Sequence, residues 1–263
     1  MGSGLSVYAR NKIVDHVLGT TAWAASPTAV YIALFVGDPI GAGSEVSGNG
    51  YARETISFAS ASNRSVAQNA GVTFNEASGP WGSVDYYAIY DALTSGNMLA
   101  YGALSSARSI VSGNTPSIAS GEVEISINTG GLSDYLANAI LDHIFNDSEY
   151  TVPTVYVALT SAAISDSDDG TDITELTMIG YAREAQAAWD AAASGASENS
   201  GLIDFGTLTS TGQTVEALCL TDNASTGAGN VLWYDNSESQ AVANGDSVQI
   251  AIGDFDVALT ATA

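Results

Sequence analysis

Lysine, cysteine and long apolar runs are all scarce in this chain of 263 residues, and each scarcity excludes a class of protein. Lys and Arg number 6 against 29 Asp and Glu, so the formal net charge is −23 at pH 7. Nucleic acid and anionic lipid both require a cationic surface, and we therefore expect neither nucleic acid nor a membrane as a partner. The one cysteine, Cys219, excludes an internal disulfide, and its apolar neighbours predict a buried, inert thiol.

Long apolar segments are also missing. No apolar run approaches the roughly 18 residues of a membrane-spanning helix, and the start of the chain lacks the basic and apolar regions of a signal peptide. These absences predict a soluble protein made in the cytoplasm.

The acids are crowded after residue 130, where twenty acids accompany one base, Arg183. Residues 1–130 contain nine acids and five bases. An acid-rich, lysine-poor surface suits saline surroundings, which favours a marine or halophilic source.

A long repeat is what the sequence does contain. Residues 4–17 return at 131–144, and residues 30–34 return at 155–159. The pentapeptide Gly-Tyr-Ala-Arg-Glu at 50–54 returns unchanged at 180–184. Order and spacing are kept to the C-terminus, so we predict two tandem repeat domains, 1–130 and 131–263. Each has an ordinary size for an independent core, and the period is too long for a solenoid.

Each copy has the pattern of a mainly β domain opened by a short helix. The helical pattern covers residues 5–17 and 132–144, with Ser6 and Ser133 as N-caps. Short β-branched and aromatic runs follow, separated by Gly, Ser and Asn turns. They lie at 30–36, 51–58, 84–90, 98–104, 122–127, 155–160, 215–220, 231–234 and 254–259. This pattern indicates an antiparallel β-sandwich or open barrel, with the helix at an edge or open end. The alanine-rich segment 183–193 has helical propensity, but its counterpart 53–61 alternates, so we predict a strand there.

The only histidines, His16 and His143, each follow an aspartate, Asp15 or Asp142. An Asp-His pair is compatible with a general base or a metal site. Neither copy offers a serine elbow, a second histidine or paired cysteines to complete such a site. A histidine that closes a helix, where the dipole favours the charged imidazole, is the simpler hypothesis.

Arg53 and Arg183 lie in the pentapeptide that both copies share. Because Arg183 is the one base among twenty acids, we expect each arginine to form a structural ion pair. The candidate partners are Asp15 or Glu54 in the first copy and Asp142 or Glu184 in the second. A binding role at an interface is the alternative, since arginine suits a planar, bidentate partner.

One acidic stretch resembles a calcium loop in its density of carboxylates. Its acids are Asp166, Asp168, Asp169, Asp172 and Glu175, around Gly170. The spacing breaks the EF-hand pattern, because the acids do not fall at positions 1, 3 and 5 and no Glu closes the loop at 12. We predict a solvated acidic loop and no cofactor; binding of Ca²⁺ or Na⁺ is the alternative. The Gly-x-Gly patterns at 41–43 and 48–50 lack the context of a phosphate loop.

Several aromatic residues fit either a sugar-binding surface or a core, and we favour core and interface positions. They are Trp81, Tyr86, Tyr87, Tyr90, Tyr101, Trp189, Trp233 and Tyr234.

The order of the motifs carries a family resemblance. It runs Leu-Ser-x-Tyr-x-x-Asn-x-Ile-x-Asp-His, Val-Tyr-x-Ala-Leu, Gly-Tyr-Ala-Arg-Glu, a Trp-Gly turn at 81–82 and Gly-Asn-x-Leu-x-Tyr-Gly at 96–102. This pattern resembles a family of small tailed-phage virion proteins, often labelled tail fibre proteins, some of them minor or auxiliary capsid components. The first copy matches almost throughout. The second departs after Ala185 and lacks the Trp-Gly turn. The resemblance implies a virion location and carries over no catalytic residues.

The leading hypothesis is therefore a non-enzymatic decoration or cement protein that bridges neighbouring capsid subunits. Its expected partners are the major capsid protein or other virion structural proteins, together with self-association. A duplicated unit can hold two neighbours at fixed spacing, and the second attachment gains from effective concentration. The alternative is a tail fibre or a tail-tip module that binds a receptor or carbohydrate. A glycan hydrolase is a third possibility, but no spacing singles out a carboxylate pair.

Overall fold

The computed structural model describes residues 4–23, 26–128, 131–186 and 188–259. We call 4–128 the first copy and 131–259 the second. The described chain is mainly antiparallel β-structure with a helix at the start of each copy, which confirms the predicted fold class. Helix α1 spans Val7–Val17 and helix α2 spans Asp134–Phe145. Within the described ranges, neither is long and apolar enough to cross a membrane.

A serine caps each helix and ties it to its own copy. The hydroxyl of Ser6 accepts the N–H of Ala9 at 3.1 Å, and that of Ser133 accepts the N–H of Leu136 at 3.1 Å. These bonds satisfy one of the free donors at each helix start, and they confirm both predicted caps. The same hydroxyls donate to backbone carbonyls of strands β8 and β17, whose bounds follow.

The first copy is built on one six-stranded antiparallel sheet and two strand pairs. The sheet order is β1 (Gly4–Leu5), β8 (Met98–Ile110), β7 (Gly82–Tyr90), β2 (Val30–Val36) and β3 (Ser44–Glu45), with β4 (Glu54–Ile56) also paired to β2. The pairs are β10 (Glu124–Ser126) with β5 (Ser65–Ala67), and β6 (Val72–Thr73) with β9 (Ser117–Ile118). Alternate residues of β2 enter the core, so Val30, Ile32 and Leu34 are buried together.

The second copy repeats this plan with a shorter sheet. Its order is β12 (Glu184–Ala185), β11 (Tyr156–Thr160), β16 (Ala217–Thr221) and β17 (Val231–Asp235). Three pairs complete the copy: β13 (Ala196–Glu198) with β20 (Asp256–Ala258), β14 (Ile203–Thr207) with β19 (Ser247–Ile250), and β15 (Gln213–Val215) with β18 (Gln240–Val242).

The alanine-rich segment 183–193 is extended rather than helical. Its strand β12 covers two residues, and Trp189 and Ala193 form isolated bridges. Residue 187 lies outside the described residues. The repeat therefore predicts the backbone better here than the helical propensity of alanine does, because tertiary pairing overrides propensity.

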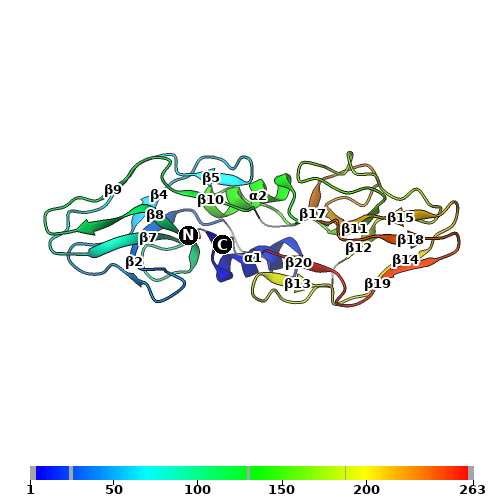
Figure 1. Cartoon of the computed structure of the whole chain (residues 1–263), viewed down its shortest axis with the longest axis horizontal. Helices are drawn as coiled ribbons and strands as arrows, with labels where there is room; N and C mark the ends of the chain where they lie inside the picture. The colour runs from blue at the N-terminus through cyan, green and yellow to red at the C-terminus, as the bar shows by residue number, and fades with distance from the viewer. Residues whose placement is uncertain (1–3, 24–25, 129–130, 187, 260–263) are drawn as a thin grey trace.

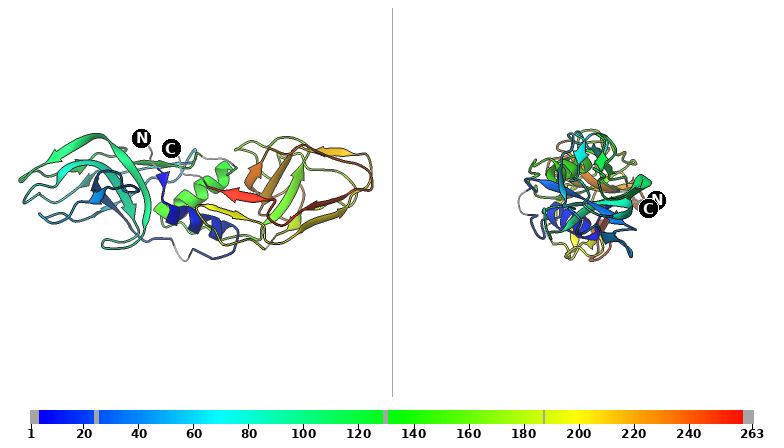
Figure 2. Two further views of the ribbon diagram at one scale, coloured as in Figure 1. Left: turned by 60° about the horizontal axis from the view of Figure 1, so that its bottom comes forward. Right: turned by 90° about the vertical axis from the view of Figure 1, so that its left-hand side faces the viewer.

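The two helices lie side by side at the middle of an elongated molecule, with a β-body at each end (Figures 1 and 2). Each helix packs against the strand pair of the opposite copy: α1 contacts β13, and α2 contacts β5. One continuous cluster of buried apolar side chains includes residues of both copies. The copies therefore share a core at their junction.

Matched hydrogen bonds hold each helix against the opposite copy. Oδ1 of Asp142 accepts the N–H of Ala61, and Oδ1 of Asp15 accepts the N–H of Ala192, both at 2.7 Å. One turn earlier in each helix, Oδ1 of Asn138 accepts the N–H of Arg64 at 2.9 Å, and Oδ1 of Asn11 that of Gly195 at 2.5 Å. The junction is therefore pseudo-symmetric: each helix binds the tight turn that precedes β5 or β13 of the other copy.

Candidate functional site

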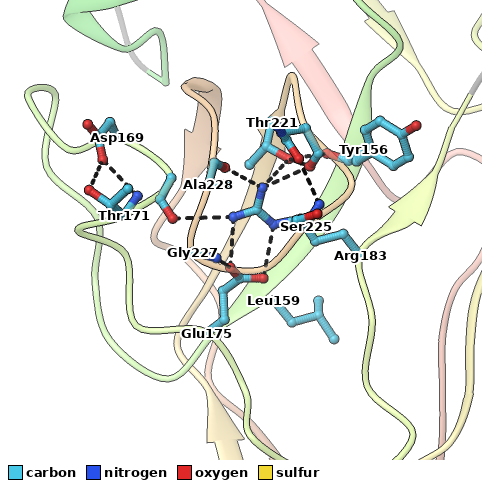
Figure 3. A network of polar contacts seen from close by, with 12 residues as sticks. Tyr156, Leu159, Asp169, Thr171, Glu175, Arg183, Thr221, Ser225, Gly227 and Ala228 are labelled. Carbon is cyan, nitrogen blue, oxygen red and sulfur yellow. Dashed lines mark hydrogen bonds and ion pairs between the residues drawn. The ribbon is translucent and has the colours of Figure 1, made fainter.

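Arg183 lies in a closed network of polar contacts in the second copy (Figure 3). Its Nη2 is 2.8 Å from Oε1 of Glu175, and its Nε donates to Oε2 at 3.1 Å. Nη1 donates to the carbonyls of Asn223 and Ala228, each at 2.8 Å. The side chains of Arg183 and Glu175 are 0% and 3% exposed. Because breaking a buried pair from one side leaves an uncompensated charge, we expect this pair to stabilise the copy.

Arg53 makes the same contacts in the first copy. Its Nη2 is 2.8 Å from Oε2 of Glu45, and its Nε donates to Oε1 at 2.9 Å. Nη1 donates to the carbonyls of Ala92 at 2.9 Å and Ser95 at 2.6 Å. Its guanidinium carbon also lies 3.5 Å from the ring centre of Tyr90, a cation–π contact. Burial lowers the pKa of Arg53, but the hydrogen bonds and charge of Glu45 outweigh it and raise the pKa.

The tyrosine of the shared pentapeptide completes each ion pair. Oη of Tyr51 donates to Oε1 of Glu45 at 3.1 Å, and Oη of Tyr181 donates to Oε2 of Glu175 at 2.9 Å. Burial raises the pKa of both phenols, so they stay protonated donors.

The glycine of the pentapeptide is required by the backbone. Gly50 and Gly180 have φ of +80° and +95°, and a Cβ at either position would lie 2.9 Å from a backbone carbonyl oxygen. Only glycine fits both conditions. The Tyr and Arg of the pentapeptide are therefore tied to the ion-pair site, and the Gly is required by the backbone beside Glu76 or Thr207.

The ion-pair partners differ from the four candidates taken from the sequence. Glu54 and Glu184 follow the arginines directly in extended backbone, where neighbouring side chains point to opposite faces. Burial and the charge of Asp204 raise the pKa of Glu184. Asp15 and Asp142 lie on the helices and bind the opposite copy instead.

The two ion pairs differ in how they are covered. In the first copy the pair forms part of a pocket of about 450 Å³. The pocket is lined by Glu45, Val46, Ser47, Gly48, Tyr51, Ala52, Arg53, Leu93, Thr94 and Ser95. The side chain of Glu45 is 28% exposed, against 3% for its counterpart Glu175. The first copy therefore offers a site that a ligand can reach, and the second copy offers a closed one.

The two histidines meet at the junction of the copies. The rings of His16 and His143 stack with centres 5.1 Å apart, and both are buried. Nε2 of His16 lies 2.8 Å from the carbonyl of Tyr150, and Nδ1 of His143 accepts the N–H of Tyr150 at 3.1 Å. Burial lowers the pKa of both imidazoles. The expected favourable effect of the helix dipole on charged histidine is therefore outweighed by burial, and neutral rings are favoured.

The carboxylates of the acidic stretch are directed to neighbours within the protein. Asp166 lies 2.5 Å from Nη1 of Arg64, a residue of the first copy, and accepts a bond from Tyr234. The other acids of the stretch bond as follows: Asp168 with Ser165, Asp169 with Thr171, Asp172 with the N–H of Asp169, and Glu175 with Arg183. Throughout the described ranges, no three His, Cys, Asp or Glu side chains are arranged to hold a metal ion.

Most of the aromatic candidates lie in the core. Trp81, Tyr87, Tyr101, Trp189 and Trp233 are buried, whereas Tyr86, Tyr90 and Tyr234 are half-buried. Cys219 is buried as well, and burial raises the pKa of its thiol to about 12. This agrees with the predicted inert thiol, because the thiolate is the reactive form.

A family model described as "Podophage GP4 fiber I protein gp80" matches residues 4–126 and again residues 131–258. The chain belongs to this family. Both copies are members of the podophage fibre family, which confirms the resemblance to phage virion proteins and the tandem duplication, and places the chain in the virus particle. No curated protein matches the chain. The fibre family supports a structural role and association with other virion proteins.

Sequence reasoning missed Glu45, and it named Glu175 only as an acid of the calcium-like stretch and not as the partner of Arg183. Each glutamate precedes its arginine by eight residues, so the repeat itself contained the signal. The pairing itself could not be predicted, because nothing in the sequence shows that the chain between each glutamate and its arginine returns the carboxylate to the guanidinium.

Proposed function

We propose that this chain is a component of a podophage-type fibre that joins neighbouring virion proteins. The family description supports a fibre in preference to capsid decoration, the first hypothesis from the sequence. The observation that carries the proposal is the shape: two related β-bodies face outward from a shared helical junction (Figure 2). Such a unit holds two attachment surfaces at a fixed separation, which raises the strength of the second attachment.

The role is mechanical rather than catalytic in this proposal. The two imidazoles are 5% and 0% exposed and face each other at the junction. Within each Arg–Glu pair, the guanidinium and the carboxylate are 2.8 Å apart. The Arg–Glu networks rigidify the bodies, as satisfied polar networks do.

The difference in charge favours different surroundings for the two copies. The first copy carries nine acids and five bases, and the second carries twenty acids and one base. Bringing two acidic surfaces together costs free energy at moderate salt. We therefore place the first copy against neighbouring virion proteins and the second toward solvent.

Cryo-electron microscopy of purified particles, with quantitative mass spectrometry of copy number, tests the proposal. A fibre component occurs in a small number of copies per particle and lies on the tail or its attachment point. Hundreds of copies spread over the capsid lattice would establish decoration instead. Saturable glycan binding by the isolated protein would favour a receptor-binding tip.

A further inference from the structure

The second copy serves as an internal comparison for the pocket of the first. Arg53 corresponds to Arg183, since Nη1 of each donates to two carbonyls of one turn. The carbonyl of Ser95 accepts from Nη1 of Arg53 as that of Ala228 accepts from Nη1 of Arg183, so Ser95 is the counterpart of Ala228. Glu45 and Glu175 correspond in the same way, because each pairs with its arginine through both carboxylate oxygens.

Two loops close over the ion pair in the second copy. Nη2 of Arg183 donates a hydrogen bond to the carbonyl of Gly170 at 3.4 Å. The N–H of Gly170 donates in turn to the carbonyl of Gly229 at 2.8 Å. From the other side, the N–H of Gly227 donates to Oε1 of Glu175 at 3.2 Å. The pair is thus completed by one backbone carbonyl and one backbone N–H (Figure 3).

Both loops are shorter in the first copy. The connection between paired residues 36 and 44 has seven residues, whereas that between 161 and 174 has twelve. The turn that holds the arginine spans 92–95 instead of 223–228. The pocket of about 450 Å³ opens at the ion pair where the second copy has its additional chain. Leu93, at the rim, is 50% exposed.

We propose that this pocket binds a glycine-containing backbone segment of a neighbouring virion protein. One carbonyl of the segment accepts a hydrogen bond from Nη2 of Arg53, and one N–H donates to the carboxylate of Glu45. Leu93 supplies an apolar contact. The site adds a contact to the proposed function and does not depend on whether the particle contact lies on a fibre or on the capsid.

The requirement for glycine follows from the second copy. A Cβ built on Gly170 would lie 2.1 Å from the carbonyl oxygen of Ala228. Because Ser95 occupies the position of Ala228, a larger residue of the bound segment meets the same carbonyl in the first copy. The chemistry of the ligand is therefore a flexible loop with glycine at the point of closest approach.

The test uses the full chain and a synthetic peptide with the sequence of residues 166–174. Titration is followed by ¹H–¹⁵N NMR and calorimetry. We expect weak, saturable binding with shifts confined to 45–53 and 93–95, and about tenfold weaker binding when the glycine of the peptide is replaced by valine. Arg53→Lys should also weaken binding about tenfold, because lysine lacks the planar fork. The matched control, Arg108→Lys, keeps wild-type affinity.

A second variant keeps Arg53 and guards against a folding defect. Residues 37–43 and 92–95 are replaced by the sequences of 162–173 and 223–228, which closes the pocket from within. This variant should fold and lose peptide binding. Equal affinity for the glycine and valine peptides, no saturable binding, or undiminished binding by the closed variant would overturn the proposal. Binding of oligosaccharides that the closed variant loses, without binding of peptide, would assign the pocket to carbohydrate instead.

Discussion

At the scale of single residues, the two Arg–Glu pairs share the same bidentate contact and differ in burial. Arg183→Ala leaves Glu175 charged at 3% exposure, so we expect a loss of about 3–5 kcal/mol in the free energy of unfolding. Arg53→Ala leaves Glu45 at 28% exposure, where water can solvate the carboxylate in part. We therefore expect a smaller loss of roughly 1.5–3 kcal/mol in the free energy of unfolding. Urea unfolding of each variant measures both.

Arg108→Ala is the control for this comparison. Its pair with Glu122 is 3.4 Å long, both side chains are 39% exposed, and the loss should stay below about 1 kcal/mol. An Arg53 variant as unstable as the Arg183 variant would show that exposure does not distinguish the two sites.

The histidine pair predicts a stability that falls with acid. Burial lowers the pKa of His16 and His143, and His16 lowers that of His143 further, while Glu149 opposes both shifts. The unfolded chain, with histidine pKa near about 6.5, then binds more protons than the folded chain. Unfolding free energy should be constant above that pH and fall below it. His143→Gln should reduce this dependence when urea unfolding is measured between pH 8 and 5. A flat profile in the parent protein contradicts the assignment.

At the scale of elements, the contact of each helix with the opposite copy depends on side-chain amides at the junction. Asn11→Ala and Asn138→Ala each remove one bond to the opposite copy and should cost about 0.5–1.5 kcal/mol. Asn128→Ala removes an exposed bond to Ser126 within one copy and serves as the control. Thermal unfolding of the three variants measures the difference. Equal midpoints for all three would indicate that these bonds do not hold the junction.

Local elements could be predicted from the sequence, and the contact of each helix with the opposite copy could not. Ser6 and Ser133 marked both helix starts because capping depends on neighbours three residues away. Each helix, however, begins with the same motif. The sequence therefore contains no sign of which strand pair α1 or α2 covers.

The acidic stretch shows a similar limit. Its carboxylates indicated a solvated loop, yet Ile164 and Ile173 are buried against Ala158 and Cys219 of the sheet. In the first copy, larger residues such as Phe35 fill the corresponding outer face. Ile173 within the acidic stretch and Ile164 just before it were the available signal, but their contacts depend on a pairing of distant strands.

At the scale of the whole molecule, net charge predicts a salt response. Like-charge repulsion at net −23 is strong when the Debye length is about 30 Å, at 0.01 M salt, and is largely screened at about 3 Å, at 1 M. The thermal midpoint of the full chain should rise with NaCl. CaCl₂ at matched ionic strength should give the same rise, since the acids of 166–175 already bond within the protein. A falling midpoint in NaCl contradicts the electrostatic account, and a calcium-specific gain lost in Asp168→Asn with Asp172→Asn would indicate a metal site.

The central claim is that the two copies share one core through two helices, each of which contacts both copies. The boundary at 130/131 remains a prediction, and the ordinary size of each copy led us to expect an independent core in each. The continuous core changes that expectation, because α1 and α2 each bury an apolar face against the other copy.

Expression of 1–130 and 131–263 separately, and then together, is the most direct test. Sedimentation and thermal unfolding should find neither half as a stable monomer, and mixing should restore a one-to-one complex with a cooperative transition close to that of the full chain. Two monomeric halves that each unfold cooperatively near the parent midpoint, and that do not associate, would contradict the shared core.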